Sequence, residues 1–227
     1  MNRNRSHLAK AKREAAERAA REVRSGMVVG LGTGSTAKFA VEAIGWRLAR
    51  GELENVCGIP TSARTRDLAI SMDIPLTDLN VHPVVDLTLD GADEVDPEGN
   101  LIKGGGGALL REKIVASASR RFLIVVDETK LVPRLAEVFP VPVEVVPFGW
   151  KVHEARLREL GADPVLRVDA TGTPFRTDEG HFIIDCAFAN GIPDLRGTDN
   201  AIRSRPGVVE TGLFLGMSPE VFVGRGG

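Results

Sequence analysis

Four side chains in the middle of the chain have the types and spacing that proton transfer on a small anionic compound requires. Asp90 and Asp93 stand in the segment Asp-Gly-Ala-Asp-Glu, and Lys103 and Glu112 flank a run of four glycines. Carboxylates can remove and return protons, and a lysine can stabilise the negative charge that develops when a proton leaves. Crowded carboxylates also repel one another, and either Lys103 or a divalent metal ion could answer that repulsion. The alternative for each aspartate is an Asx turn.

The four glycines at 104–107 need a physical reason, because glycine loses more backbone freedom on folding than any other residue. They lead directly into good helix formers, Ala108 to Lys113. Loop N–H groups and the unpaired donors of a first helical turn form a concavity that attracts anions, and Lys103 adds a full charge beside it. The segment therefore predicts a site for a small anionic ligand. The alternative is a flexible glycine loop before an ordinary helix.

Glu112 is expected to face apolar surroundings. On a helix it shares its face with Ala108 four residues earlier, and with Val115 and Ala116 three and four residues later. An apolar setting raises the affinity of a carboxylate for protons. Glu112 is therefore the candidate base.

The composition fits a globular protein with a real core and argues against several partners. The 227 residues are 43% hydrophobic and 26% charged, and the net charge is −2 with basic and acidic residues interleaved. We therefore expect no nucleic-acid partner and no membrane partner. Cys57, Cys186 and four scattered histidines match no metal or redox pattern, so a structural metal is not expected. No apolar run reaches membrane-spanning length and the first residues lack a signal-peptide core, which predicts the cytoplasm.

A second glycine-rich turn follows the first predicted strand. Residues 7–24 read as a surface helix with an alanine-lined face and solvated charges, and residues 27–31 read as a buried strand. The strand ends in GLGTGSTA, which fails the dinucleotide-binding pattern at Ser35 and lacks the Gly-Lys of a P-loop. What remains is a glycine turn with hydroxyls at Thr33, Ser35 and Thr36 entering a helix near 37–50, which suits a phosphate or sugar oxygens. The alternative is that these hydroxyls cap the helix.

Further strands alternate with helices as far as residue 130. Strand-like runs occupy 55–59, 84–89 and 121–126, and Ser and Thr at 61, 62 and 65 open a helix after the first of these, as a weak second cradle or as caps. The alternation predicts a doubly wound α/β sheet, in which ligands collect where loops leave the carboxyl ends of the strands. Asp90, Asp93 and Lys130 all follow strand ends.

The pattern changes after residue 130. Four prolines punctuate a β-rich stretch, VPVEVV, which is followed by a helical segment and two strand-like runs. This order predicts a second, smaller α+β domain. Residues 198–205 read as a helix, and residues 207–215 and 221–223 read as closing strands.

Five motifs in this order resemble the type A ribose-5-phosphate isomerase family: GLGTGSTA, DGADE, KGGGGALLREK, VDETK and PGVVETGLF. The resemblance spans nearly the whole chain. It implies a Rossmann-like, mostly parallel catalytic domain over 1–131 and 206–227, to which the last strands return, and a small α+β domain over 132–205. It also implies a homodimer or a dimer of dimers, and an enzyme of the metal-free type with no cofactor.

The same resemblance implies a function and a set of roles. The family interconverts D-ribose 5-phosphate and D-ribulose 5-phosphate through an enediolate, in the non-oxidative pentose phosphate pathway. Glu112 would carry the proton between C1 and C2, Lys103 would steady the enediolate oxygen, and Asp90 and Asp93 would act in ring opening and hydroxyl proton exchange. The substrate-contacting positions would be Thr33, Gly34, Ser35, Thr36, Asp90, Gly91, Ala92, Asp93, Lys103, Gly104, Gly105, Gly106 and Lys130.

Departures from the family pattern spare these groups, and two rival functions stay open. Residues 177–181 read TDEGH where TDNGN is common, Gly107 stands where alanine is frequent, and the end of the chain is short. One rival is a sugar-phosphate sensor without turnover, although no DNA-binding helix-turn-helix or basic patch is evident. The other is a sugar-phosphate deaminase or CoA transferase of the same fold. The pairing of DGAD with KGGGG favours the isomerase.

Overall fold

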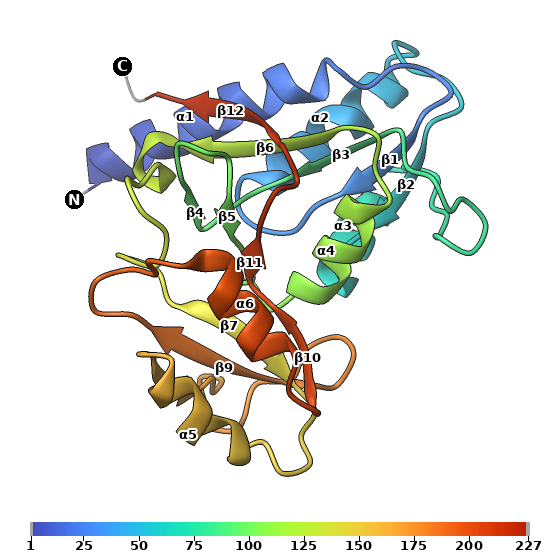
Figure 1. Ribbon diagram of the computed structural model, residues 1–227. Coiled ribbons are helices and arrows are strands. Elements are labelled where there is room, and N and C mark those ends of the chain that lie inside the picture. Colours follow the sequence, from blue (N-terminus) through green and yellow to red (C-terminus); the bar gives the residue numbers. More distant parts are fainter. Residues whose placement is uncertain (1, 226–227) are drawn as a thin grey trace. The chain divides into compact units, whose positions relative to one another are not determined.

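The structure is a computed structural model in which residues 2–225 are described, and the chain divides into two compact units (Figure 1). The first unit comprises residues 1–92, 111–130 and 217–227, and the second comprises 93–110 and 131–216. Residues 93–110 and 206–216 belong to the second unit, whereas the sequence-based prediction assigned them to the catalytic domain. The domain boundaries therefore stay a prediction.

The first unit contains a five-stranded sheet in which every pairing is parallel, with strand order β12-β6-β3-β1-β2. The strands are short and almost fully apolar, as expected for strands that are covered on both faces. The predicted doubly wound α/β sheet is confirmed. Its elements are α1 (Asn2–Ala20), β1 (Val28–Leu31), α2 (Ala37–Ala49), β2 (Cys57–Pro60), α3 (Ala63–Ser71), β3 (Leu87–Asp90), α4 (Leu109–Ser117), β6 (Phe122–Asp127), the short 3₁₀ helix η1 (Glu128–Lys130) and β12 (Glu220–Gly224).

Alternate residues of these strands point to opposite faces of the sheet and join different apolar clusters. Val29 and Leu31 of β1 pack in one cluster with the buried alanines of α1 and with Ile44 of α2. Val28 of β1 packs in another cluster, together with Val115 of α4. Helices therefore cover both faces, and α4, the helix that carries Glu112, packs on the face opposite α1 and α2.

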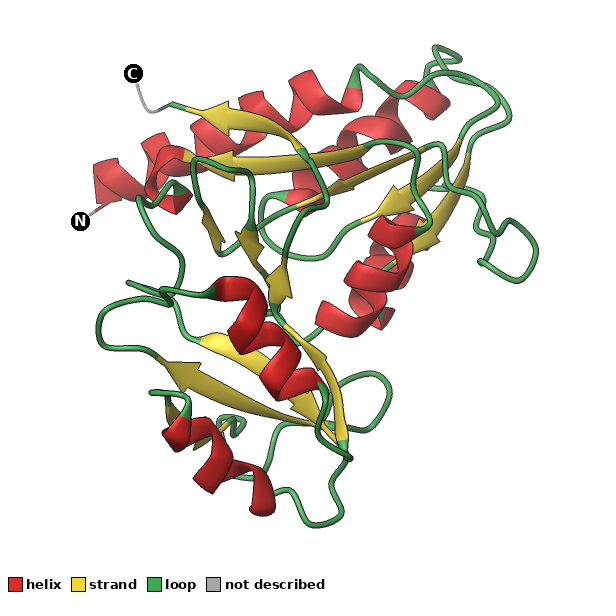
Figure 2. Ribbon diagram, viewed as in Figure 1, coloured by secondary structure: helices red, strands yellow, loops and turns green. Residues whose placement is uncertain are grey.

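The second unit contains two antiparallel sheets (Figure 2). One has strand order β10-β7-β9-β8 and the other has strand order β11-β5-β4. The mixture of helices with antiparallel strands confirms an α+β unit. Its elements are β4 (Glu94–Val95), β5 (Leu101–Ile102), β7 (Val141–Val145), α5 (Val152–Glu159), β8 (Asp163–Leu166), β9 (Phe182–Ala187), α6 (Leu195–Arg203), β10 (Val208–Thr211) and β11 (Leu213–Phe214).

Two details of the second unit differ from the sequence-based expectation. The hairpin of β4 and β5 was not predicted, because strands of two residues are too short to show an alternating pattern. The predicted closing strand 207–215 divides into β10 and β11, which pair with β7 and β5 inside the second unit. Only β12 returns to the parallel sheet.

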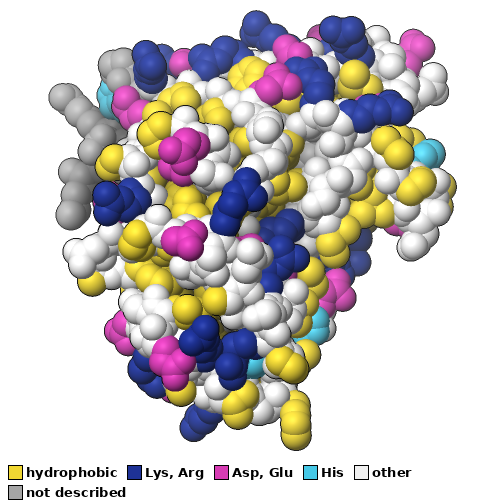
Figure 3. Space-filling model, viewed as in Figure 1, with side chains coloured by type: hydrophobic (Ala, Val, Ile, Leu, Met, Phe, Trp, Pro, Cys, Tyr) yellow, Lys and Arg dark blue, Asp and Glu magenta, His cyan; other side chains and the backbone are white. Residues whose placement is uncertain are grey.

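Charges are interspersed on the face of the molecule drawn in Figure 3, as the sequence predicted. Among the described residues, no helix is both long enough and apolar enough to cross a membrane.

Candidate active site

The first group of predicted site residues lies at the switch point of the parallel sheet. β1 pairs with β2 on one side and with β3 on the other, and ligands of doubly wound sheets bind outside the strand ends at such a point. The fully buried Asp90 ends β3, and its Oδ1 accepts hydrogen bonds from the N–H groups of Thr33 (3.0 Å) and Gly91 (2.7 Å). The sheet therefore brings GLGTGSTA and DGADE together.

The close approach of the backbone at position 32 to Asp90 requires a glycine there. A Cβ atom at position 32 would lie 2.3 Å from Oδ1 of Asp90 and 2.5 Å from its Cα atom, far inside contact distance. Gly34 has a positive φ of +117°, a conformation that side chains disfavour. The glycines of this turn thus let the backbone pass the Asp90 carboxylate and turn into α2.

Hydroxyl groups support the turn from the side of α3. The Oγ1 atom of Thr33 lies 2.8 Å from the hydroxyls of Thr61 and Ser62 and 3.1 Å from that of Thr65. Ser62 also caps α3 by accepting the N–H of Thr65, so the weakly predicted second cradle is a cap and a support for Thr33. Thr36 stands at the N-cap of α2 without a capping hydrogen bond from its side chain.

Lys12 is a residue of this region that sequence reasoning missed. Its Nζ donates to the Ser35 hydroxyl at 3.3 Å and lies 3.5 Å from Oδ2 of Asp127, the residue that ends β6. Only 18% of the side chain is exposed, so the expectation that the charges of this helix are solvated is wrong for Lys12. The available signal was its register, because Lys12 precedes the buried Ala16 and Ala19 by four and seven residues.

Asp127 makes the pair with Lys12 sensitive to acid. Burial raises the pKa of the Asp127 carboxyl, but the hydroxyl and N–H of Thr129, together with Lys12, outweigh it and leave the pKa below its usual range. A carboxyl whose pKa is lowered by folding contributes stability above its unfolded pKa of about 4, and the contribution is lost as the pH falls through the folded value.

We therefore expect Asp127→Asn to lower the free energy of unfolding at pH 7 and to lose much of that difference at pH 3. Urea titrations of both proteins at the two pH values would measure it. The matched control is Asp67→Asn, because Asp67 is exposed and pairs with the neighbouring Arg66, and such surface pairs contribute little. A difference that is equal at both pH values would contradict the expectation.

Glu112 lies in the first turns of α4 and is 3% exposed. Its predicted face is confirmed, because Ala108, Val115 and Ala116 are all buried. A carboxylate on a buried helix face is a suitable candidate for the proton acceptor of a catalytic step.

Lys103 and the glycine loop belong to the second unit. Lys103 follows β5, is 2% exposed, and places its Nζ 5.5 Å from the ring centre of Phe214 in β11. Lysine is rarely so buried, and a charge in such a place interacts strongly with what surrounds it. Gly104 and Gly107 have positive φ angles of +104° and +80°. These two glycines are thus explained by backbone conformation, apart from any ligand.

Asp93 and Glu94 have different surroundings. Oδ2 of Asp93 accepts the N–H of Gly105 at 2.8 Å, so this aspartate holds the glycine loop. The buried Glu94 accepts the N–H groups of Ala136, Val138 and Phe139 at 2.6 to 2.9 Å. The third carboxylate of DGADE is therefore a structural group that holds a loop.

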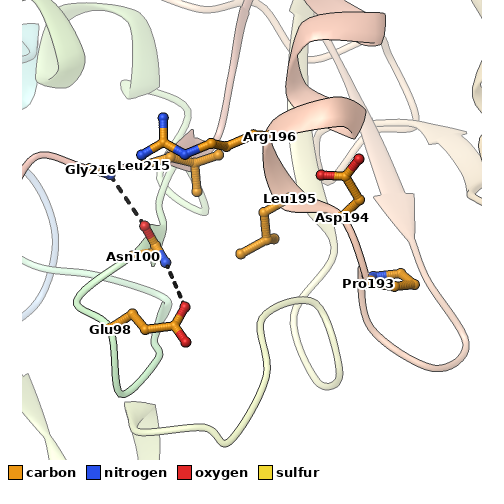
Figure 4. Close-up of a pocket in the computed structure, with 8 residues that line it drawn as sticks. All are labelled: Glu98, Asn100, Pro193, Asp194, Leu195, Arg196, Leu215 and Gly216. Carbon is orange, nitrogen blue, oxygen red and sulfur yellow. Dashed lines mark hydrogen bonds between the residues drawn. The ribbon is translucent and has the colours of Figure 1, made fainter.

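The remaining observations concern Lys130, a pocket and possible metal ligands. Lys130 ends η1, three residues after β6. A pocket of about 430 Å³ in the second unit is lined by Glu98, Asn100, Arg196 and neighbours and by none of the predicted site residues (Figure 4). Among the described residues, no group of three or more His, Cys, Asp or Glu side chains could hold a metal ion. The metal-free reaction stays a prediction.

The fold places the chain in the class of doubly wound α/β proteins, whose ligands bind at the carboxyl ends of the parallel strands. The family model of ribose 5-phosphate isomerase A, also described as phosphoriboisomerase A, matches residues 57–227. The chain therefore belongs to the ribose 5-phosphate isomerase A family, and the resemblance seen in the sequence is confirmed.

Individual relatives agree with this assignment. Ribose-5-phosphate isomerase A of Roseiflexus castenholzii is 54% identical over 207 residues, which cover 91% of this chain and 88% of that protein. A solved D-ribose-5-phosphate isomerase in complex with phospho-erythronic acid is 41% identical, with a TM-score of 0.93 and coverage of 96% and 95% of the two chains. The ribose 5-phosphate isomerase of Plasmodium falciparum is 39% identical, with the same TM-score and the same coverage. The predicted isomerase function is borne out at the level of the family.

Proposed function

We propose that this chain interconverts D-ribose 5-phosphate and D-ribulose 5-phosphate and that Glu112 carries the proton between C1 and C2. The observation that carries the proposal is the burial of Glu112 on an apolar helix face directly after the glycine loop. A buried carboxylate can remove a carbon-bound proton and keep it from solvent until it is returned.

The reaction needs two half-steps that balance. In the open-chain aldose, Glu112 takes the proton from C2, the C2–H electron pair forms the C1–C2 double bond, and the C1 carbonyl oxygen becomes negatively charged. Return of the proton from Glu112 to C1, with transfer of the hydroxyl proton from O2 to the negatively charged O1, gives the ketose. Lys103 stabilises the enediolate oxygen in between, and Asp90 and Asp93 serve ring opening and the exchange of hydroxyl protons.

The other predicted residues bind the substrate in this proposal. The phosphate and the sugar oxygens would bind to loops that carry N–H groups, hydroxyls and cations. These loops are the glycine turn with Thr33, Ser35 and Thr36, the segments 90–93 and 103–106, and Lys130. The solved relative in complex with phospho-erythronic acid supports a small sugar-acid phosphate as the kind of ligand.

The proposal extends to assembly and cellular place. We propose a homodimer or a dimer of dimers that works in the cytoplasm in the non-oxidative pentose phosphate pathway. The catalytic domain would comprise 1–131 and 206–227, and the small domain 132–205. Membership of the ribose 5-phosphate isomerase A family supports the pathway. The assembly, the compartment and the domain boundaries rest on the resemblance of the sequence motifs, and one relative, from Arabidopsis thaliana, is described as chloroplastic.

The test of the function is direct conversion by the purified protein after treatment with EDTA. Ribose 5-phosphate is expected to give ribulose 5-phosphate at an undiminished rate, because the proposed groups are side chains of this chain. Binding of ribose 5-phosphate without conversion would contradict the isomerase function and favour a sugar-phosphate sensor. A rate that EDTA abolishes and a divalent cation restores would keep the function and overturn the metal-free mechanism.

A further inference from the structure

Arg167 of the second unit reaches the glycine loop from the sheet. It follows β8, and its Nη1 donates to the carbonyl oxygen of Gly104 at 2.9 Å and to that of Gly105 at 3.3 Å. The side chain is only 14% exposed. Arg167 thus contacts the loop that follows Lys103, 62 and 63 residues earlier in the chain.

Asp185 of β9 fixes the guanidinium group. One carboxylate oxygen accepts from Nε at 2.8 Å and the other accepts from Nη2 at 2.5 Å, which is the paired, fork-to-fork geometry that arginine makes with a carboxylate. The ring of Phe175 lies 5.8 Å from the guanidinium carbon. The ion pair therefore sets the direction of the remaining donor, Nη1, toward the loop.

The peptide group between Gly104 and Gly105 is held at both ends. Its carbonyl oxygen accepts from Arg167, and its N–H donates to Oδ2 of Asp93 at 2.8 Å. The next peptide group also has its carbonyl oxygen on Arg167, and in a trans peptide the N–H points the opposite way. The amide of Gly106 is thus directed away from Arg167. Glycine is otherwise free to rotate these planes, so the two bonds choose one orientation.

We propose that Arg167 is a positioning residue for the reaction, acting through the glycine loop on Lys103 and on the loop amides. This inference rests on the proposed function of that loop. Arg167 has no direct part in proton transfer; with Asp185 it keeps the loop in the orientation in which Lys103 and the amide of Gly106 meet developing negative charge. Sequence reasoning missed it because the partners lie far apart along the chain.

The test is Arg167→Met, which keeps an apolar stem of similar length and removes every donor. Its matched control is Arg176→Met, because Arg176 also donates to a backbone carbonyl, that of Gly180 at 2.9 Å, and also lies over a phenylalanine, Phe182 at 4.9 Å. We expect kcat for ribose 5-phosphate to fall about 10- to 100-fold in Arg167→Met, with a KM change below about threefold, and to stay within about twofold of wild type in the control.

A double-mutant cycle separates positioning from general stability. In a Lys103→Met background, adding Arg167→Met is expected to lower kcat by less than about threefold, because the side chain of Lys103 is already gone and only the loop amides remain for Arg167 to position. A structural role would give independent losses that multiply in the double variant, and that result would overturn the proposal. Equal kcat values for Arg167→Met and Arg176→Met would overturn it too.

Two further variants test the proposal if Arg167→Met does not fold. Arg167→Lys keeps the positive charge but cannot bond Asp185 and both carbonyls together, and Asp185→Asn keeps the shape of the anchor while weakening its grip. Both are expected to fold with a melting temperature near that of wild type and to lose kcat; full kcat in both would contradict the proposal. Absence of turnover in the wild-type protein itself would instead refute the proposed function.

Discussion

Glu112→Gln is expected to lower kcat for the interconversion of ribose 5-phosphate and ribulose 5-phosphate by about 10²- to 10⁴-fold, the usual contribution of a general base. Glutamine has the size and shape of glutamate but cannot take up a proton, so binding is kept while the carbon-bound proton stays in place. KM should change little, because the lost interaction belongs to the transition state. Initial rates over a range of ribose 5-phosphate concentrations measure both constants.

The matched control for Glu112→Gln is Glu159→Gln. Glu159 is also a helical glutamate, but its side chain is 64% exposed and pairs with Arg156 on the surface of α5. It should retain wild-type kcat. A second readout is transfer of deuterium from C2 of C2-deuterated ribose 5-phosphate to C1 of ribulose 5-phosphate, which should slow with kcat in Glu112→Gln. Undiminished turnover in Glu112→Gln would keep the isomerase and assign the base to another residue.

Glu94→Ala is expected to lower the free energy of unfolding by about 3–5 kcal/mol, because it leaves one buried and two partly buried backbone donors without their acceptor. The Glu94 carboxylate accepts three backbone N–H groups of the segment 136–139, and no water can replace it easily because Glu94 is 1% exposed. Urea unfolding, followed by circular dichroism, measures the change through the transition midpoint and slope.

Glu98→Ala is the matched control for Glu94→Ala, since Glu98 lies four residues away in the same β4–β5 region and is exposed. Its free energy of unfolding should stay within about 0.5 kcal/mol of wild type. A destabilisation of the same size in both variants would contradict the structural role of Glu94. Activity should also fall in Glu94→Ala, because Glu94 fixes the backbone of Phe139, and the ring of Phe139 packs against Gly105 of the glycine loop. A Cβ atom at position 105 would lie 2.9 Å from that ring.

Much of the fold could be predicted from the local pattern of apolar and turn-forming residues in the sequence. The buried strands of the first unit are largely apolar runs, and all five of its strands, the closing strand β12 included, were placed within three residues of their observed ends. The two-residue strands β4 and β5 were missed because a run of two residues carries no period.

The candidate site divides in the same way. The sequence by itself determined the candidate base, Glu112, because its neighbours at helical spacing are apolar, and it marked Lys103, Asp90 and Asp93 by their positions beside glycine loops and strand ends. Those marks depend only on residues within one turn of helix or one strand, where spacing along the chain fixes spacing in space.

Tertiary structure alone decided which polar groups hold the site in place. Lys12 meets Ser35 and Asp127, and Arg167 meets Gly104 and Asp185, across separations of 18 to 115 residues. Glu94, which stands beside Asp93 in the same motif, binds a loop 42 to 45 residues later. Such pairings arise when packing brings distant elements together, and packing is set by the whole apolar pattern and not by the residues that meet. The sequence therefore named the groups that could do the chemistry, and the fold determined what positions them.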